Sequence, residues 1–178
     1  MALTISDKEA ARQDRSEWPV ALQEEFAREA RSPNGCVGSE LVSETDKVRV
    51  WTIRLKPGQR FGFHRHVLNY FWTAITPCRG RQHLMDGTTV EYTYAPGETR
   101  HETYGPGEFK VHDLQNIGDG DMVFMTVEFL ESANAPLAIP EEIRRKAARS
   151  EERVDLPIGN SGVIALPGLD PGIDRAIQ

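Results

Sequence analysis

Short β-forming runs alternate with turn clusters between Cys36 and Glu131, and this alternation limits the possible folds more than any other feature. The runs are rich in Val, Thr and aromatic residues, and they read KVRVWTIRL, LNYFWTAIT, TTVEYTY and DMVFMTVEF. The clusters between them are rich in Gly, Pro and Asp, and they read KPGQ, MDGT, APGE, YGPGE and NIGDGD. Because no helical segment separates the runs, the sequence predicts an all-β sandwich or barrel rather than an α/β sheet.

Helical patterns flank this β-rich region on both sides. Residues 1–31 are predicted to be helical, because Leu22 and Phe26 lie four residues apart and Pro19 lies near a helix start. The cluster SPNG ends this pattern. A second helix is predicted over residues 139–153, which begin with acidic residues in the first turn.

The chain therefore divides into three predicted parts. They are a helical extension at 1–36, a β-barrel at 37–132, and a helix with an extended arm at 133–178. The last segment, 154–178, is rich in Gly and Pro and cannot form a long regular element. It is either a disordered tail or an arm across a neighbouring surface, and we expect the arm.

Composition excludes several classes of partner. The 178 residues carry a net charge of -6 and no long basic stretch, so we expect neither nucleic acid nor an anionic membrane as the main partner. No run of about 18 apolar residues indicates a transmembrane helix, and the segment MALTISDKEAARQDR lacks the apolar core of a secretion signal. Cys36 and Cys78 form no CxxC pair, which predicts reduced thiols in a cytoplasmic protein.

Two histidines one residue apart, His64 and His66, are the first candidate metal ligands. Side chains alternate faces along a strand, so these two imidazoles project to the same side about 6–7 Å apart. At this spacing two ring nitrogens can converge on one ion. The alternative is a pair of histidines that hydrogen-bond to their neighbours.

A second histidine motif follows about forty residues later, as HDLQN, with His112 and Asn116 before a Gly-Asp turn. In order and spacing, the two motifs resemble those of the cupin superfamily, and the resemblance covers residues 47–131. In wording they also look like the small bacterial cupins named β-alanine degradation proteins. The resemblance implies an antiparallel double-stranded β-helix, or jelly-roll barrel. It implies a divalent metal ion on His64, His66 and His112, with Asn116 just after the second motif.

The chain departs from the cupin pattern at the fourth ligand, because the usual Glu is replaced by Tyr70. Three alternatives follow. Three histidines and waters could hold Fe, Mn, Ni or Zn; Tyr70 could bind the metal or donate a hydrogen bond beside it; or the barrel could hold no metal. Glu102 is the second choice for the missing ligand.

If the strand through the two histidines has no bulge, the alternation of side chains predicts which further residues face the site. Its inner face then carries Gly62, His64, His66, Leu68, Tyr70, Trp72 and Ala74, and its outer face carries Phe61, Phe63, Arg65, Asn69 and Phe71. Arg60 shares the histidines' parity and is predicted to lie near the barrel mouth. There it could hold a substrate carboxylate through two hydrogen bonds.

The remaining candidates have simpler interpretations. His83 and His101 are expected in strands as half-buried histidines with polar partners, and Arg79 and Arg81 form a small cationic cluster. The outer stripe of Phe residues is expected to be a packing face, and the cupin resemblance implies that this face meets an arm or a second subunit. The resemblance and the terminal arms together imply a homodimer.

The functional hypothesis is a metal-binding protein whose small-molecule substrate is unassigned. It is either a dioxygenase-like oxidoreductase that acts on a small organic acid, with Tyr70 and Arg60 as catalytic residues, or a non-catalytic binding protein with an empty or structural-metal barrel.

Overall fold

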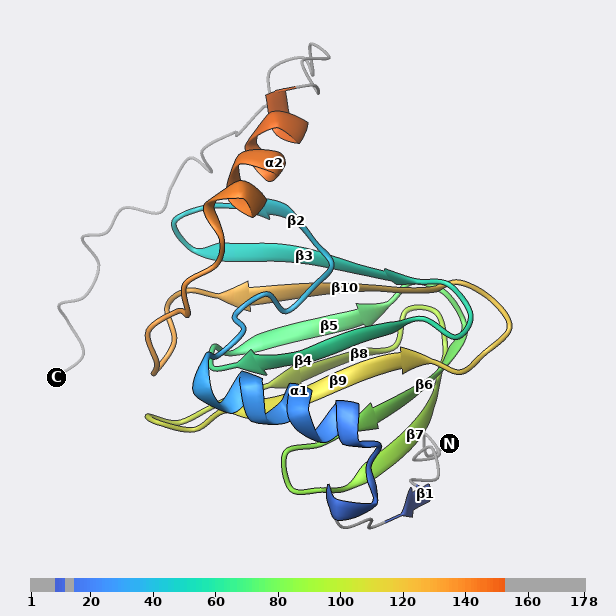
Figure 1. The fold of residues 1–178 in the computed structure, drawn as a ribbon. Helices are drawn as coiled ribbons and strands as arrows, with labels where there is room; N and C mark the ends of the chain where they lie inside the picture. The colour runs from blue at the N-terminus through green and yellow to red at the C-terminus, as the bar shows by residue number, and fades with distance from the viewer. Residues whose placement is uncertain (1–8, 12–14, 153–178) are drawn as a thin grey trace, which may run out of the picture.

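The computed structural model describes the backbone of residues 9–11 and 15–152, and the side chains of residues 15–147. Two five-stranded antiparallel sheets face each other; one helix lies over the face of one sheet, and the other packs at the edge of the second sheet (Figure 1). Sheet A contains, in spatial order, β1 (Glu9–Ala11), β7 (Thr89–Tyr94), β6 (Cys78–His83), β9 (Lys110–Asn116) and β4 (Arg60–His66). Sheet B contains, in spatial order, β2 (Glu40–Glu44), β3 (Val48–Leu55), β10 (Met122–Phe129), β5 (Tyr70–Ala74) and β8 (Thr99–Glu102).

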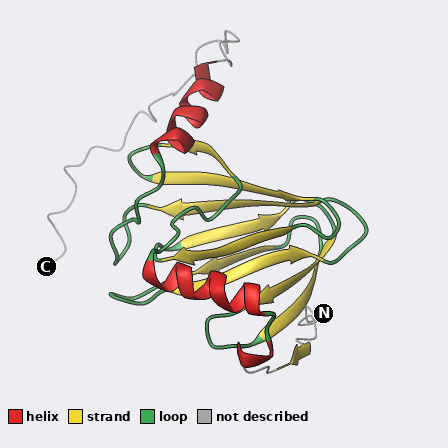
Figure 2. Ribbon diagram, viewed as in Figure 1, coloured by secondary structure: helices red, strands yellow, loops and turns green. Residues whose placement is uncertain are grey.

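The strand order identifies the architecture. Four antiparallel pairs are nested along the chain: β3 pairs with β10, β4 with β9, β5 with β8, and β6 with β7. Successive pairs alternate between sheet B and sheet A, as when one long hairpin is folded over into two facing sheets (Figure 2). This order is the jelly roll, or double-stranded β-helix. The predicted all-β fold class is confirmed.

Three Pro-Gly turns connect strands of the barrel. In the first, the N–H of Gln59 donates to the carbonyl of Lys56, with Pro57 and Gly58 between them. The glycine of each turn has a positive φ, at Gly58 (80°), Gly97 (80°) and Gly107 (78°). This is the third position of a type II turn, where any side chain would be strained.

Helix α1 (Val20–Arg31) covers the outer face of sheet A (Figure 1). Leu22 and Phe26 lie on its inner side and pack with Trp18 against Phe63 and Val111. A single 3-10 turn precedes the helix. The helical prediction is correct for this segment and wrong for Glu9–Ala11, which pairs with the open edge of β7 as strand β1.

Helix α2 (Glu141–Glu152) packs on β2 and agrees with the predicted second helix. Ala147 and Ile143 contribute to a separate core with Val37, Leu41 and Trp51. The predicted C-terminal arm lies outside the described residues.

The prediction of one continuous strand through both histidines and the following aromatic run is wrong. Strand β4 ends at His66, residues 67–69 form a corner, and β5 starts at Tyr70 in the other sheet. Asn69 holds the corner, since its carbonyl accepts the Phe129 N–H and its side chain accepts the Tyr104 N–H. A jelly roll requires such a crossing between sheets, and strand alternation in the sequence does not reveal it.

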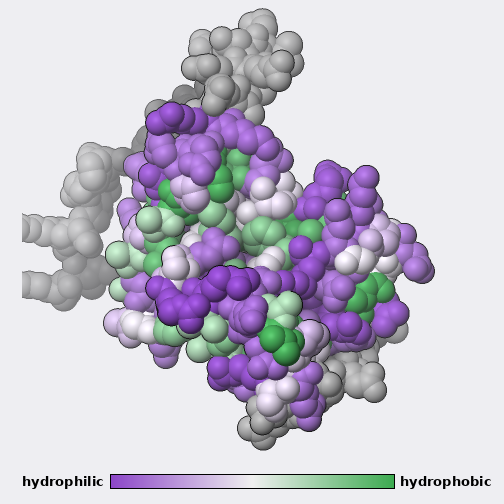
Figure 3. Space-filling view, viewed as in Figure 1, coloured by the Kyte–Doolittle hydropathy of each residue, from purple (hydrophilic) through white to green (hydrophobic). Residues whose placement is uncertain are grey.

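The surface over α1 is mostly hydrophilic (Figure 3). Within the described part of the chain, no helix has the length and apolar character needed to cross a membrane.

Candidate metal site in the barrel

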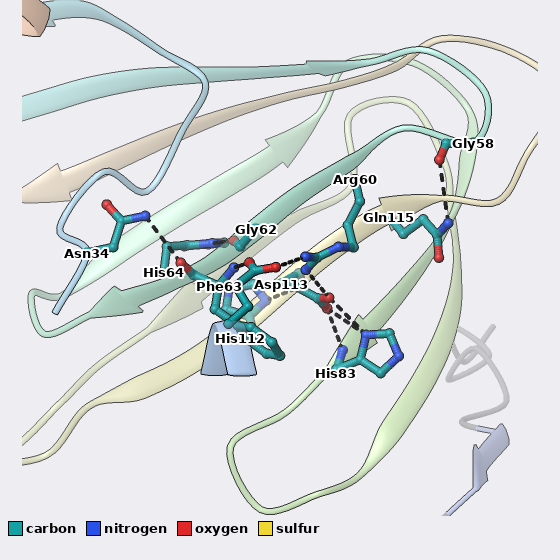
Figure 4. A network of polar contacts seen from close by, with 11 residues as sticks. Asn34, Gly58, Arg60, Gly62, Phe63, His64, His83, His112, Asp113 and Gln115 are labelled. Carbon is teal, nitrogen blue, oxygen red and sulfur yellow. Dashed lines mark hydrogen bonds and ion pairs between the residues drawn. The ribbon is translucent and has the colours of Figure 1, made fainter. Parts of the chain in front are cut away.

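The first histidine of the candidate site follows a β-bulge in β4. The pairing register with β9 shifts between Phe61 and His64, so β4 accommodates one extra residue. A Cβ on Gly62 would lie 2.5 Å from Glu25 Oε1, so glycine lets α1 approach here. Glu25 accepts the Phe63 N–H at 2.9 Å, and the Gly62 carbonyl accepts His64 Nδ1–H at 2.9 Å (Figure 4). The bulge thereby orients the His64 ring.

The three predicted histidines come together. His64 pairs directly with His112 across β4 and β9, and His66 follows on the same face of β4. Their side chains are buried, with exposed fractions of 1%, 3% and 8% for His64, His66 and His112. One ring nitrogen from each lies within 4.8 Å of the others, and the Nε2 atoms of His66 and His112 are 3.1 Å apart.

Burial keeps the cluster uncharged. Loss of hydration lowers the pKa of His64 to about 4 and lowers the pKa values of His66 and His112 well below their ordinary value. The nearby positive charge of Lys110 also lowers all three pKa values, while the backbone hydrogen bonds of His64 and His112 offset part of the lowering. All three imidazoles are therefore neutral near pH 7 and have a lone pair available for a metal ion.

Backbone carbonyls fix two of the three tautomers. His64 Nδ1–H donates to Gly62, and His112 Nδ1–H donates to the Asp113 carbonyl at 3.1 Å, so their Nε2 lone pairs point toward the cluster. Nδ1 of His66 is buried without a hydrogen-bond partner among the described residues.

The donor set fits a divalent transition metal. A metal–nitrogen bond of about 2.1 Å places neighbouring ligands about 3.0–3.4 Å apart; the His66–His112 separation of 3.1 Å lies in this range, and all three ring nitrogens lie within 4.8 Å of one another. Three nitrogen ligands leave coordination positions open for water or substrate. Among the described residues no carboxylate or thiolate joins the cluster, so the set is neutral and suits Fe, Mn, Ni or Zn.

A cavity of about 50 Å³ lies beside the cluster, which is room for a few water molecules or one small ligand. Sheet B lines it with Ile53, Tyr70, Trp72, Phe124 and Thr126. Sheet A lines it with His64, His66, His112, Lys110, Leu114, Gln82 and Tyr94, and Val37 completes the wall.

Tyr70 lies against the histidines, as expected, although it arrives from the opposite sheet. Its ring stacks on His66 with centroids 4.2 Å apart and planes 18° apart. Burial raises the Tyr70 pKa well above its ordinary value of 10. A neutral phenol favours hydrogen-bond donation over metal binding.

Arg60 does not lie at the barrel mouth, and that prediction is wrong. The extra residue in the bulge reverses the alternation, so Phe61 takes the inner position and contacts His64 with ring centroids 5.0 Å apart. Arg60 lies on the outer face, where it pairs with Glu25 and with Asp113 at 2.7 Å (Figure 4).

Asp113 is fully buried behind the cluster, and the sequence analysis did not identify it. Its carboxylate accepts the His83 N–H at 2.7 Å and lies 2.9 Å from His83 Nδ1, in addition to Arg60. The polar partner expected for His83 is thus confirmed. His101 is exposed and lies against Phe71.

The other candidates lie apart from the cluster. Glu102 faces Lys110, with Nζ to Oε1 at 3.6 Å, and is not grouped with the three histidines. Asn116 closes the β9–β10 turn by donating to Leu55 and Gly120.

Arg79 and Arg81 both pair with Glu91.

Lys110 is the charged residue among the cavity lining, and the sequence analysis did not identify it. It precedes His112 by two residues in β9, so strand alternation places both side chains on one face. That spacing was the available signal.

Comparison with known proteins gives structural neighbours only. No family model matches the sequence, and no curated protein matches it. A cupin domain from Bordetella pertussis Tohama I is 24% identical over 50% of this chain and 88% of its own, with a TM-score of 0.45. The neighbours are cupin and double-stranded β-helix proteins.

Two further solved structures show the same kind of likeness. A conserved protein with a double-stranded β-helix domain from Klebsiella pneumoniae is 25% identical over 53% of this chain and 76% of its own, with a TM-score of 0.42. An RmlC-like cupin family protein from Methanocaldococcus jannaschii is 19% identical over 51% of this chain and 76% of its own, with a TM-score of 0.41.

Proposed function

We propose that this protein is a metal-binding member of the cupin superfamily, and that it is an oxidoreductase acting on a small organic acid. The observation that carries the proposal is the convergence of three buried, uncharged imidazoles at one wall of a small cavity. His64, His66 and His112 would hold one divalent ion. A bound redox-active ion would supply open coordination positions and electron transfer.

The other cavity residues have complementary roles in this proposal. Tyr70 keeps its proton and donates a hydrogen bond to a substrate placed beside His66. The aromatic and aliphatic wall of sheet B excludes water from the reacting groups. Arg60 has no catalytic role in this proposal, since its guanidinium is engaged on the outer face.

A non-catalytic binding protein is the second candidate, and two observations favour it. The ligand set contains no carboxylate among the described residues, and His66 Nδ1 lacks the hydrogen-bond partner that usually orients a metal-binding histidine. Such a site would hold a metal less tightly than one containing a carboxylate.

The first test measures metal content. Protein purified without added metal is analysed by elemental analysis, alongside His112→Ala and the matched control His101→Ala, which changes an exposed histidine in sheet B. We expect metal in the wild type and in His101→Ala, and a loss of more than about 100-fold in metal affinity for His112→Ala. Unchanged metal content in His112→Ala would rule out the site.

The second test separates catalysis from binding. Dioxygen uptake is measured with metal-loaded protein and a panel of small carboxylic acids, for the wild type and Tyr70→Phe. We expect uptake with at least one acid, and a lower kcat with little change in metal content for Tyr70→Phe. Metal-loaded protein that consumes no dioxygen with any acid supports the binding protein instead.

Other sequence predictions are retained as proposals. A homodimer agrees with the outer face of sheet B, where Phe129 and Met125 are exposed when only the described residues are considered. A cytoplasmic location, and the absence of nucleic-acid and membrane partners, stay predictions.

A further inference from the structure

Lys110 is the one cationic side chain among the described residues that line the cavity, and no carboxylate lines it. Apart from the three histidines, the remaining lining is apolar or carries hydroxyl and amide groups. The charge of the cavity wall is therefore positive, before any metal is added. An apolar cavity with one fixed cation favours a small anion over a neutral molecule of the same shape.

The register of sheet A directs Lys110 toward the histidines. Lys110 is the cross-strand partner of His66, and it lies two residues from His112 on the same face of β9. Side chains in these positions are neighbours, about 4.5–7 Å apart at their bases. A ligand held beside the three imidazoles is therefore within reach of the Lys110 ammonium.

The ammonium of Lys110 is only loosely engaged. Its ion pair with Glu102 spans 3.6 Å, longer than a hydrogen bond, and the two side chains are 30% and 37% exposed. Glu102 lies opposite Tyr70 in sheet B, so the pair with Lys110 bridges the two sheets beside the cavity wall. A lysine has three donors, and a ligand carboxylate can replace this weak contact with charge-assisted hydrogen bonds.

We propose that Lys110 selects a small carboxylate as the ligand of this cavity, and that Glu102 is the counter-ion that the ligand displaces. This rests on the proposed function for the identity of the site, and it assigns to Lys110 the anchoring role first expected of Arg60. The cavity volume limits the ligand to a few non-hydrogen atoms.

The test compares propionate with propionamide, which has nearly the same shape and no charge. Binding to the purified protein is titrated by NMR, before and after removal of metal with a chelator, so that a carboxylate bound to the metal is distinguished from one bound to Lys110. We expect propionate to bind at least about tenfold more tightly than propionamide in both forms.

For each of four variants the proposal predicts the direction in which propionate binding changes. Lys110→Met should remove the preference for propionate and leave propionamide binding unchanged, whereas Lys110→Arg should retain the preference. Glu102→Gln should tighten propionate binding, because the competing carboxylate is gone. Lys56→Met, at an exposed lysine in the β3–β4 turn, is the matched control and should behave as the wild type.

The failure of this inference is distinguishable from the failure of the metal proposal. Equal binding of propionate and propionamide, or an unchanged preference in Lys110→Met, overturns the role of Lys110 even if the protein contains metal. A protein without metal that still prefers propionate through Lys110 supports the inference, while the metal proposal fails.

Discussion

The two sheets contribute different things to the cavity. Sheet A carries the three histidines and Lys110, and its outer face is covered by α1 (Figure 1). Two ion pairs join that helix to β4: Glu29 with Arg65 at 3.0 Å, and Glu25 with Arg60. Sheet B contributes mainly aromatic and aliphatic wall, and its outer face is exposed at Met125 and Phe129. The three histidines and Lys110 thus lie on the sheet whose outer face is held by helix α1.

Two buried carboxylates show the same contrast in electrostatic terms. Asp113 in sheet A has two basic partners, Arg60 and His83. Glu128 in sheet B accepts one hydrogen bond, from the Trp51 ring N–H at 2.8 Å. Burial raises the Glu128 pKa to about 7, and this hydrogen bond and the nearby Arg49 offset it only in part. In sheet A the buried Asp113 carboxylate therefore has basic partners, whereas in sheet B the environment of Glu128 favours the protonated, uncharged form.

The largest expected effect tests the bracing of sheet A. Phe63 is 3% exposed between β4 and α1, stacked on Trp18 with ring centroids 5.7 Å apart. Phe63→Ala should lower the free energy of unfolding by about 3–4 kcal/mol, because it removes the ring and leaves a cavity under the helix. Denaturant unfolding measures the change.

Phe129→Ala is the matched control on the outer face of sheet B, where the ring is 37% exposed. It should cost about 1 kcal/mol or less. Equal losses for the two variants would mean that sheet B is covered in solution as tightly as sheet A, which would point to a dimer through that face.

The next effect depends on pH. The folded protein holds the Glu128 proton more tightly than the unfolded chain, because its pKa is about 7 rather than 4.5. Glu128 therefore favours folding most at low pH, and this contribution falls between about pH 4.5 and pH 7. Each pKa unit is worth about 1.4 kcal/mol, so Glu128→Gln should stabilise the protein by about 3 kcal/mol above pH 7 and have little effect near pH 4.

The glutamine keeps the oxygen that accepts the Trp51 N–H, so the variant changes charge and preserves shape. Urea unfolding at several pH values measures the difference. A gain of equal size at all pH values would show that packing, and not ionisation, separates the two proteins.

The sequence predicted the fold class because alternating β-forming runs and Pro-Gly turns are local signals. His64 and His66 were found for the same reason, since alternate residues of a strand share a face, whereas His112 was assigned through the resemblance of its motif to the second cupin motif. The predictions that proved wrong concern features that depend on interactions between distant segments. The bulge at Gly62 is stabilised by Glu25 of α1, and it moves Arg60 to the outer face and Phe61 to the inner face.

The corner after His66 escaped prediction for a similar reason. The run from Leu68 to Thr76 has the composition of one strand, and the crossing is fixed by Asn69 contacts with two remote segments. Tyr70 nevertheless reaches the cavity, because the corner turns β5 into the facing wall. Asp113 was missed because its significance lies in its partners, His83 and Arg60, rather than in a motif.

The smallest expected effect separates the outer network from the metal ligands. Asp113→Asn replaces a buried carboxylate by an amide of the same shape and weakens its bonds to Arg60 and His83. It should lower the free energy of unfolding by about 1–3 kcal/mol. Glu91→Gln is the control on the same sheet, since its pairs with Arg79 and Arg81 are solvent-exposed, and it should cost about 0.5 kcal/mol or less.

The metal content of Asp113→Asn shows whether the ion pairs of Asp113 hold the imidazoles in place or only stabilise the fold. The His112 ring donates to the backbone carbonyl of Asp113, and the His64 ring donates to the carbonyl of Gly62, so neither ligand depends on the Asp113 side chain. Asp113→Asn should therefore unfold more easily and yet bind metal as the wild type does, by elemental analysis at a temperature where both are folded. Loss of metal in Asp113→Asn alone would mean that the ion pairs behind sheet A, and not the bulge and its carbonyls, hold the imidazoles in place.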